Sequence, residues 1–207
     1  MNPRLITALA VAGVISAAAI VIGALGQRSA SAEPVALSPG VTAPASPFEG
    51  ATTPPGVRAP DFSLRDQDGE PVSMRALRGR PVVVTFLRSK CDESCGPQAQ
   101  QIKGALNDLG RDVPVLAVSV DPREDTPSAA RHFLEEQGMV GRMDLVLGSR
   151  EELEPLWKGF AIQPQERKLE HQARIALIDA RGFQRVGFPL DQATPERIAH
   201  DLAVLGA

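Results

Sequence analysis

The central part of the chain alternates short apolar runs with longer segments of helical periodicity. Residues 81–87 and 113–120 are apolar runs rich in β-branched side chains, which are typical of strands buried on both faces of a sheet. Between them, residues 96–109 carry apolar side chains on one stripe of a helix, and Gly110 is placed to end it. Strands that alternate with helices predict a central sheet with parallel members.

Capping signals mark three further helices. Thr126 and Pro127 are expected as the N-cap and first residue of one helix. Ser149 and Glu152 have the spacing of a capping box and begin the next. The last helix is predicted to start after Thr194.

Two hairpins complete the predicted order of elements. One spans residues 62–74, with Asp68 and Gly69 at its turn, and the other spans residues 173–188. We therefore predict an α/β fold with a central mixed sheet flanked by helices, plus an N-terminal hairpin.

The first part of the chain differs in composition from the rest. Leu5–Gly26 carries no charge and is long enough to cross a bilayer, which needs about 20 apolar residues. We predict residues 1–32 to be a membrane anchor, or a signal segment cleaved after Ala30–Ala32. The Pro-rich residues 33–57 are expected to be a linker, and residues 58–207 the folded domain. Both readings place the domain outside the cytoplasm, either on a single N-terminal anchor in the cell membrane or secreted.

Composition narrows the functional classes. The chain has 22 Lys and Arg against 25 Asp and Glu, a net charge of −3, which disfavours nucleic acid as a partner. Its two cysteines can form neither a disulfide scaffold nor a four-cysteine zinc site. Any metal or redox site must use this one pair.

The two cysteines stand where a buried strand gives way to a helix. Cys91 and Cys95 are therefore expected at the carboxyl edge of the sheet, where ligands bind in open α/β folds. On a helix, positions i and i+4 lie about 5–6 Å apart, which suits a metal held between two sulfurs. The helix N-terminus, with Arg88 and Lys90 nearby, favours the thiolate, which serves as metal ligand and as redox nucleophile. A structural disulfide or two inert thiols are the other readings of the pair.

A strand ending in CxxxC before a helix, followed by a hairpin and a last helix, resembles the thioredoxin fold. In that topology the start of the strand near residue 173 faces the cysteines, and His171 directly precedes it. We predict His171 to be a metal ligand. His132 and His200 lie among charged residues on predicted helices and are expected at the surface.

On these and further motifs the sequence resembles the Sco/SenC family of copper chaperones for cytochrome c oxidase. The resemblance rests on these segments: Ala59–Leu64, Cys91 and Cys95 with Pro97, the stretch Ser119–Pro127 and His171 before Ile175–Gly182. It implies a membrane-tethered, thioredoxin-like metallochaperone, rather than an enzyme, that binds copper through Cys91, Cys95 and His171. It also implies delivery of copper to the binuclear site of cytochrome c oxidase subunit II.

Two thiolates and one imidazole favour copper(I) or zinc over hard cations. We prefer copper, because no carboxylate or further histidine stands out as the base of a hydrolytic zinc site, and we expect the site to hold Cu(I) and Cu(II). The alternative function is a thiol-disulfide oxidoreductase that reduces the cysteines of a metal-site acceptor, which needs the Cys pair but not His171. A peroxidase of the peroxiredoxin type is disfavoured, since Arg88 stands where its Thr-x-x-Cys context requires threonine.

Overall fold

The computed structural model describes residues 46–90, 94–162 and 174–206. All of them belong to one compact unit, Ala45–Ala207. Among these residues no helix has the length and apolarity that a bilayer crossing requires. The predicted segment 1–32 and most of the predicted linker lie outside the described residues.

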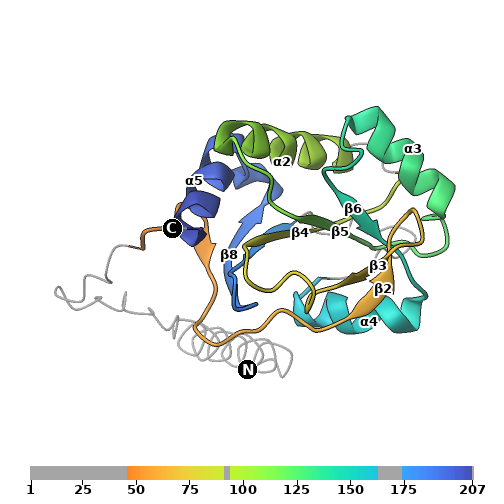
Figure 1. Cartoon of the computed structure of the whole chain (residues 1–207), viewed down its shortest axis with the longest axis horizontal. Helices are drawn as coiled ribbons and strands as arrows, with labels where there is room; N and C mark the ends of the chain where they lie inside the picture. The colour runs from red at the N-terminus through yellow and green to blue at the C-terminus, as the bar shows by residue number, and fades with distance from the viewer. Residues whose placement is uncertain (1–45, 91–93, 163–173, 207) are drawn as a thin grey trace, which may run out of the picture. The chain divides into compact units, whose positions relative to one another are not determined.

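The centre of the fold is a mixed six-stranded sheet in the order β1-β8-β7-β4-β5-β6 (Figure 1). β4 pairs in parallel with β5 and antiparallel with β7, so the predicted parallel pair and the predicted C-terminal hairpin share one sheet. The strands are β1 (Ala51–Thr52), β4 (Val82–Leu87), β5 (Val115–Ser119), β6 (Asp144–Val146), β7 (Arg174–Ile178) and β8 (Gln184–Pro189).

The predicted N-terminal hairpin forms a separate two-stranded sheet. It consists of β2 (Ser63–Arg65) and β3 (Pro71–Ser73), which pair antiparallel. The turn between them is closed by Asp66, whose carboxylate accepts the backbone N–H groups of Asp68 and Glu70. The pattern of short strands around Asp68 and Gly69 is thus confirmed.

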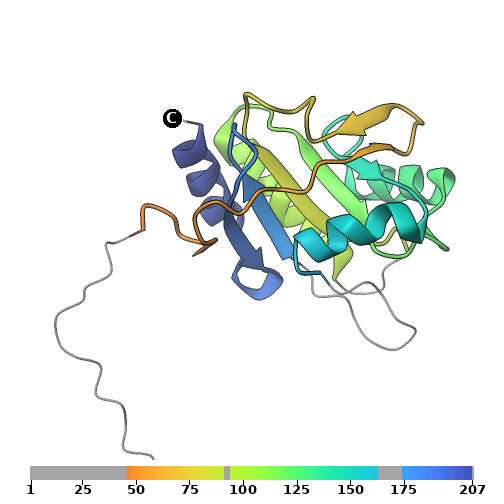
Figure 2. The ribbon, with the colours of Figure 1, turned by 90° about the horizontal axis from the view of Figure 1, so that it is seen from below.

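Helices cover both faces of the central sheet (Figures 1 and 2). Side chains from α2, α3 and α5 form one core with Val83 and Leu87 of β4, while α4 packs with Val82, Val84 and Phe86 on the other face. The alternation follows from the pleat, which turns successive side chains to opposite faces. The helices are α2 (Cys95–Leu109), α3 (Pro127–Gln137), α4 (Arg150–Gly159), η1 (Leu190–Gln192) and α5 (Pro195–Leu205).

The predicted capping signals are confirmed. The side chain of Thr126 accepts the backbone N–H of Ala129, and Ser149 and Glu152 form the reciprocal capping box. Thr194 caps α5 in the same way. These bonds satisfy N–H groups that a helix leaves open at its start, which is why short sequence signals located the helices well.

The folded part begins earlier than residue 58. β1 pairs with β8, and the backbone N–H of Thr53 donates to the carbonyl of Arg185 at 2.9 Å. Upstream of β1, Glu49 and Gly50 donate their N–H groups to the buried carboxylate of Asp201 on α5. Part of the range predicted as a linker is therefore held in the fold by backbone hydrogen bonds, which composition alone does not reveal.

Candidate metal centre

The two strands that adjoin the predicted ligands in sequence meet at one edge of the sheet: β4 ends there and β7 begins there. β4 ends at this edge with Leu87, and Cys95 is the first residue of α2. β7 runs antiparallel to β4, with Ile175 opposite Thr85, so the start of β7 lies beside the end of β4. Cys91 and His171 themselves lie outside the described residues.

A buried hydrogen-bond cluster ties these two segments together. The hydroxyl of Thr85 on β4 donates to the carbonyl oxygen of Arg174 at 3.1 Å. The Nε2 of Gln98, in the first turn of α2, donates to the same carbonyl at 3.1 Å and also to the Thr85 hydroxyl. Thr85 and Gln98 are both fully buried. The first residue of β7 is thereby fixed against the helix that begins with Cys95.

Cys95 is buried at the N-terminus of α2. It takes part in a disulfide bond, and the described residues include no free cysteine. The Cys95 sulfur is thus in the oxidised state in this structure. Metal coordination requires the thiolate, so the bond must be reduced before this sulfur can serve as a ligand.

The loop between β4 and Cys95 is anchored by Asp125. One oxygen of this buried carboxylate accepts the backbone N–H of Ser89 at 2.6 Å and its hydroxyl at 2.7 Å. The other oxygen accepts the hydroxyl of Ser119 at the end of β5. Burial raises the pKa of Asp125, although the hydrogen bonds from Ser119 and Ser89 act in the opposite direction. The acidic motif of residues 119–127 thus holds the loop that leads to the cysteines.

The basic residues expected near the thiols have different surroundings. The Nζ of Lys90 lies 2.8 Å from a carboxylate oxygen of Glu124, and both side chains are exposed. This hydrogen bond and charge pairing raise the pKa of Lys90 and lower that of Glu124. Arg88 is half-buried, and its Nε has no hydrogen-bond partner within the described part of the chain.

The other two histidines have the surface roles that the sequence predicted. His132 is exposed on α3 and pairs with Glu136 at 3.2 Å. His200 is exposed on α5, and its Nδ1 lies 2.9 Å from Asp201, whose hydrogen bond raises the pKa of the imidazole. Within the described ranges no group of three or more His, Cys, Asp or Glu could hold a metal ion.

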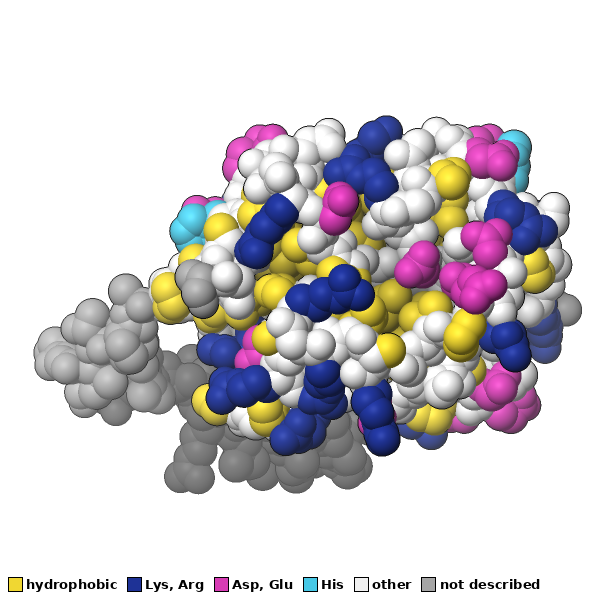
Figure 3. Space-filling view, in the orientation of Figure 1, with side chains coloured by type: hydrophobic (Ala, Val, Ile, Leu, Met, Phe, Trp, Pro, Cys, Tyr) yellow, Lys and Arg dark blue, Asp and Glu magenta, His cyan; other side chains and the backbone are white. Residues whose placement is uncertain are grey.

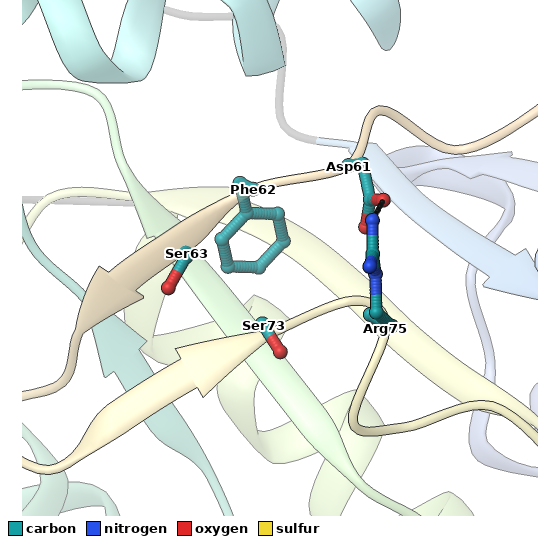
Figure 4. A pocket seen from close by; sticks show the side chains of 5 residues that line it. All are labelled: Asp61, Phe62, Ser63, Ser73 and Arg75. Atoms are coloured by element: carbon teal, nitrogen blue, oxygen red, sulfur yellow. Dashed lines mark hydrogen bonds and ion pairs between the residues drawn. The ribbon is translucent and has the colours of Figure 1, made fainter.

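A surface hollow of 390 Å³ lies beside the hairpin of β2 and β3 (Figure 4). Its lining includes Phe62, and it is spanned by an exposed ion pair between Asp61 and Arg75 at 3.3 Å. It contains none of the sequence-predicted ligands. We do not assign a site to it.

The sequence predicted Cys91, Cys95 and His171 as ligands but did not predict the residues that support the neighbouring segments. In the sequence, Gln98 is a polar position in a predicted helix and Thr85 is a β-branched residue in a predicted strand. Asp125 was noticed only as part of a family motif. Their roles depend on contacts between segments 13 to 89 residues apart, for which one sequence carries no local signal.

The family model described as SCO1/SenC matches residues 50–206. The chain belongs to the SCO1/SenC family. The match begins at Gly50, which agrees with the start of the ordered backbone pairing.

Individual family members are distant but match along most of the domain. A SCO1 protein homologue of Bacillus subtilis (strain 168) is 26% identical over 131 residues, which are 58% of this chain and 68% of the homologue. The structure of Bradyrhizobium japonicum ScoI with copper bound has a TM-score of 0.61 and 26% identity, covering 72% of this chain and 99% of ScoI. BsSco, described as a Sco family protein of cytochrome c oxidase assembly with a disulfide switch, has a TM-score of 0.65 and 24% identity, covering 75% and 96%. The fold is thus the thioredoxin-like fold of Sco proteins.

Peroxiredoxins match only a part of the chain. Peroxiredoxin Q of Sedum lineare is 30% identical over 79 residues, which are 38% of this chain and 42% of that protein. A shorter match of 44 residues to peroxiredoxin Q of Oryza sativa subsp. japonica reaches 50% identity. These matches are local and leave the family assignment unchanged.

Proposed function

We propose that this protein binds copper and serves in the assembly of cytochrome c oxidase. Its membership in the SCO1/SenC family and its similarity to a ScoI structure with copper bound support this function. The observation that carries it is the Gln98–Thr85–Arg174 cluster, because it joins the helix of Cys95 to the strand that follows His171.

The proposed ligands are Cys91, Cys95 and His171. Two thiolates with one imidazole form a soft donor set that suits copper(I), and the imidazole also suits copper(II). The described segments fit this set, since Cys95 begins a helix at the carboxyl end of β4 and the start of β7 is bonded to that helix. The roles of Cys91 and His171 as copper ligands are part of this proposal.

Copper is the cargo in this account. A site at the edge of a sheet leaves one side open to an incoming protein, whose thiolates or imidazoles can replace the three ligands one at a time. The proposed acceptor is the binuclear copper site of cytochrome c oxidase subunit II. Direct exchange keeps the metal bound to protein ligands throughout.

Copper stoichiometry of residues 46–207 tests the ligand assignment. This part is one compact unit that contains both cores, so it can be studied alone. After reduction, the domain should bind one copper ion, and Cys91→Ser, Cys95→Ser and His171→Ala should each lose stoichiometric binding. His132→Ala is the matched control and should bind as the parent does. Equal binding by all four variants contradicts the proposal.

A second function is favoured by the disulfide at Cys95. In thiol-disulfide exchange, the reduced Cys pair attacks a disulfide of an acceptor protein. The pair is oxidised to a disulfide, and the acceptor gains two electrons and two protons as two thiols. His171→Ala separates the two functions, because it should abolish copper retention yet leave reduction of a protein disulfide intact.

We also propose that residues 1–32 anchor the domain in the cell membrane. The uncharged segment Leu5–Gly26 supports this, and a tether would raise the concentration of the domain near a membrane-bound acceptor. The full chain should remain in the membrane fraction after a carbonate wash. Release of a shortened chain into the soluble fraction would instead support a cleaved signal.

A further inference from the structure

Four arginines from separate segments gather at the turn between β7 and β8. We call them the arginine face: Arg58, Arg78, Arg181 and Arg185. The guanidinium of Arg58 lies 4.3 Å from the ring centroid of Phe183, and that of Arg181 lies 5.6 Å from the same centroid. The guanidinium of Arg78 donates to the carbonyl of Arg181. Three guanidinium groups therefore share one small area of surface.

The positive charge of this face is only partly compensated. Asp179 is its ion-pair partner, with an oxygen 3.1 Å from Arg185 and 3.6 Å from Arg181. The Asp179 side chain is 8% exposed, and its other oxygen accepts the backbone N–H groups of Arg181 and Phe183. One buried carboxylate is thus the ion-pair partner of two of these four arginines, and three of the four are exposed.

This excess runs against the charge of the whole chain, which is −3. Lys and Arg side chains gather toward the lower left of the face drawn in Figure 3, around the start of β8. The Phe183 ring and the Arg181 carbonyl hold the guanidinium groups of Arg58, Arg181 and Arg78 in place, and all three arginines are exposed. Guanidinium groups bind phosphate in a bidentate manner, so such a surface suits an anionic phosphate-bearing partner.

The N-terminal part of the chain enters the fold beside this face. The guanidinium of Arg185 lies 5.7 Å from the ring centroid of Phe48, just before β1. Upstream of Phe48 the sequence leads back to the uncharged segment Leu5–Gly26. The arginine face and the candidate metal centre lie at opposite ends of β7, since the turn follows Ile178 whereas the metal centre adjoins Arg174.

We propose that the arginine face docks on the anionic phospholipid headgroups of a membrane. In this orientation the candidate metal centre points away from the lipid, toward the aqueous side. The lipid is the favoured partner because the chain that enters at Phe48 carries the apolar segment. Each arginine near an anionic bilayer contributes an affinity factor of about five.

Cosedimentation of residues 46–207 with vesicles tests this proposal independently of the anchor. The domain should bind vesicles of phosphatidylcholine with phosphatidylglycerol, should not bind phosphatidylcholine alone, and should dissociate at high salt. Arg58→Gln with Arg181→Gln should weaken binding about 25-fold, as two factors of about five. Arg123→Gln with Arg142→Gln removes the same charge elsewhere and should leave binding within about twofold.

Three results would overturn the proposal. The first is that the domain does not bind the anionic vesicles. The second is that the control pair of substitutions weakens vesicle binding as much as the first pair does. The third is that inorganic phosphate releases the domain from the vesicles at an ionic strength far below that at which chloride releases it. The last result would assign the face to a free phosphate compound. Thermal unfolding checks that both variants fold, and if the first pair does not, Arg58→Gln alone should still weaken binding about fivefold. None of these vesicle experiments measures copper binding, so failure of the membrane proposal leaves the proposed function unchanged.

Discussion

Gln98 lies where α2 meets β7, and its amide is buried with no exposure to solvent. Gln98→Leu removes the hydrogen bonds that the Gln98 amide donates to the Arg174 carbonyl and to the Thr85 hydroxyl. We expect the free energy of unfolding to fall by about 1–3 kcal/mol. Under the proposed function, copper affinity should fall about tenfold as well, because the segments that carry the ligands lose a link.

Gln100 provides the control, since it is an exposed glutamine on the same helix whose two hydrogen bonds go to Gln137 at the surface and not to β7. Gln100→Leu should change the free energy of unfolding by less than about 0.5 kcal/mol. Urea unfolding measures both variants. Equal stability of the Gln98 variant and the parent protein would show that the cluster does not stabilise the joint between α2 and β7.

Asp125 makes a second residue-scale prediction, which concerns pH. Its raised pKa means that the folded state keeps this proton to higher pH than the unfolded chain does. The contribution of Asp125 to stability is therefore largest below about pH 4, the ordinary Asp value, and decreases as pH rises through the raised pKa. Asp125→Asn removes the titration and keeps an oxygen that can accept from Ser89.

The measurement is urea unfolding of the parent protein and Asp125→Asn from about pH 4 to 7. The parent should lose stability relative to the variant as pH rises. Other carboxylates with shifted pKa values, such as Asp144, are common to both proteins and cancel in the difference. A difference that stays constant, or that changes in favour of the parent, contradicts this account.

The sequence predicted which residue types could bind a metal but not what supports them. Cys91 and Cys95 were predicted as ligands because their spacing and their place after a strand are local features. Thr85 and Asp125 support the same edge through partners far away in sequence. Such pairings depend on tertiary packing, and a single sequence gives no periodicity or spacing by which to find them.

At the scale of elements, the sequence predicted a helix start or a turn correctly where side chains at that boundary form local hydrogen bonds with the backbone. The starts of α3, α4 and α5 follow from side-chain caps, and the turn between β2 and β3 follows from the bonds of Asp66. β1 was missed because it has two residues, both exposed, and its stability comes from pairing with β8 at the other end of the domain. Proline-rich composition around it indicated a linker instead.

The attachment of β1 can be tested at Asp201, whose side chain is fully buried. Asp201→Ala leaves the backbone N–H groups of Glu49 and Gly50 without this acceptor. We expect the free energy of unfolding to fall by about 1–3 kcal/mol and amide hydrogen exchange to accelerate at residues 49–53. Asp191→Ala, at an exposed position of η1, is the control. Unchanged exchange at residues 49–53 would contradict a fastening role for Asp201.

For the molecule as a whole, the antiparallel pairing of β7 with β4 decides the arrangement. It places the start of β7 beside the end of β4, and it places the β7–β8 turn at the opposite end of the sheet. One strand thus connects the candidate metal centre with the arginine face. The order of elements in the sequence predicted a mixed sheet, whereas the charge segregation along β7 emerged only from the three-dimensional structure.

The central claim is that copper binds at this edge through two sulfurs and one imidazole. X-ray absorption spectroscopy of the reduced, copper-loaded domain 46–207 measures the ligands of the metal directly. We predict two sulfur scatterers and one imidazole nitrogen in the parent domain, and loss of this copper signal in His171→Ala and in Cys95→Ser. A copper environment of nitrogen and oxygen alone, or one identical in all three proteins, would contradict the account.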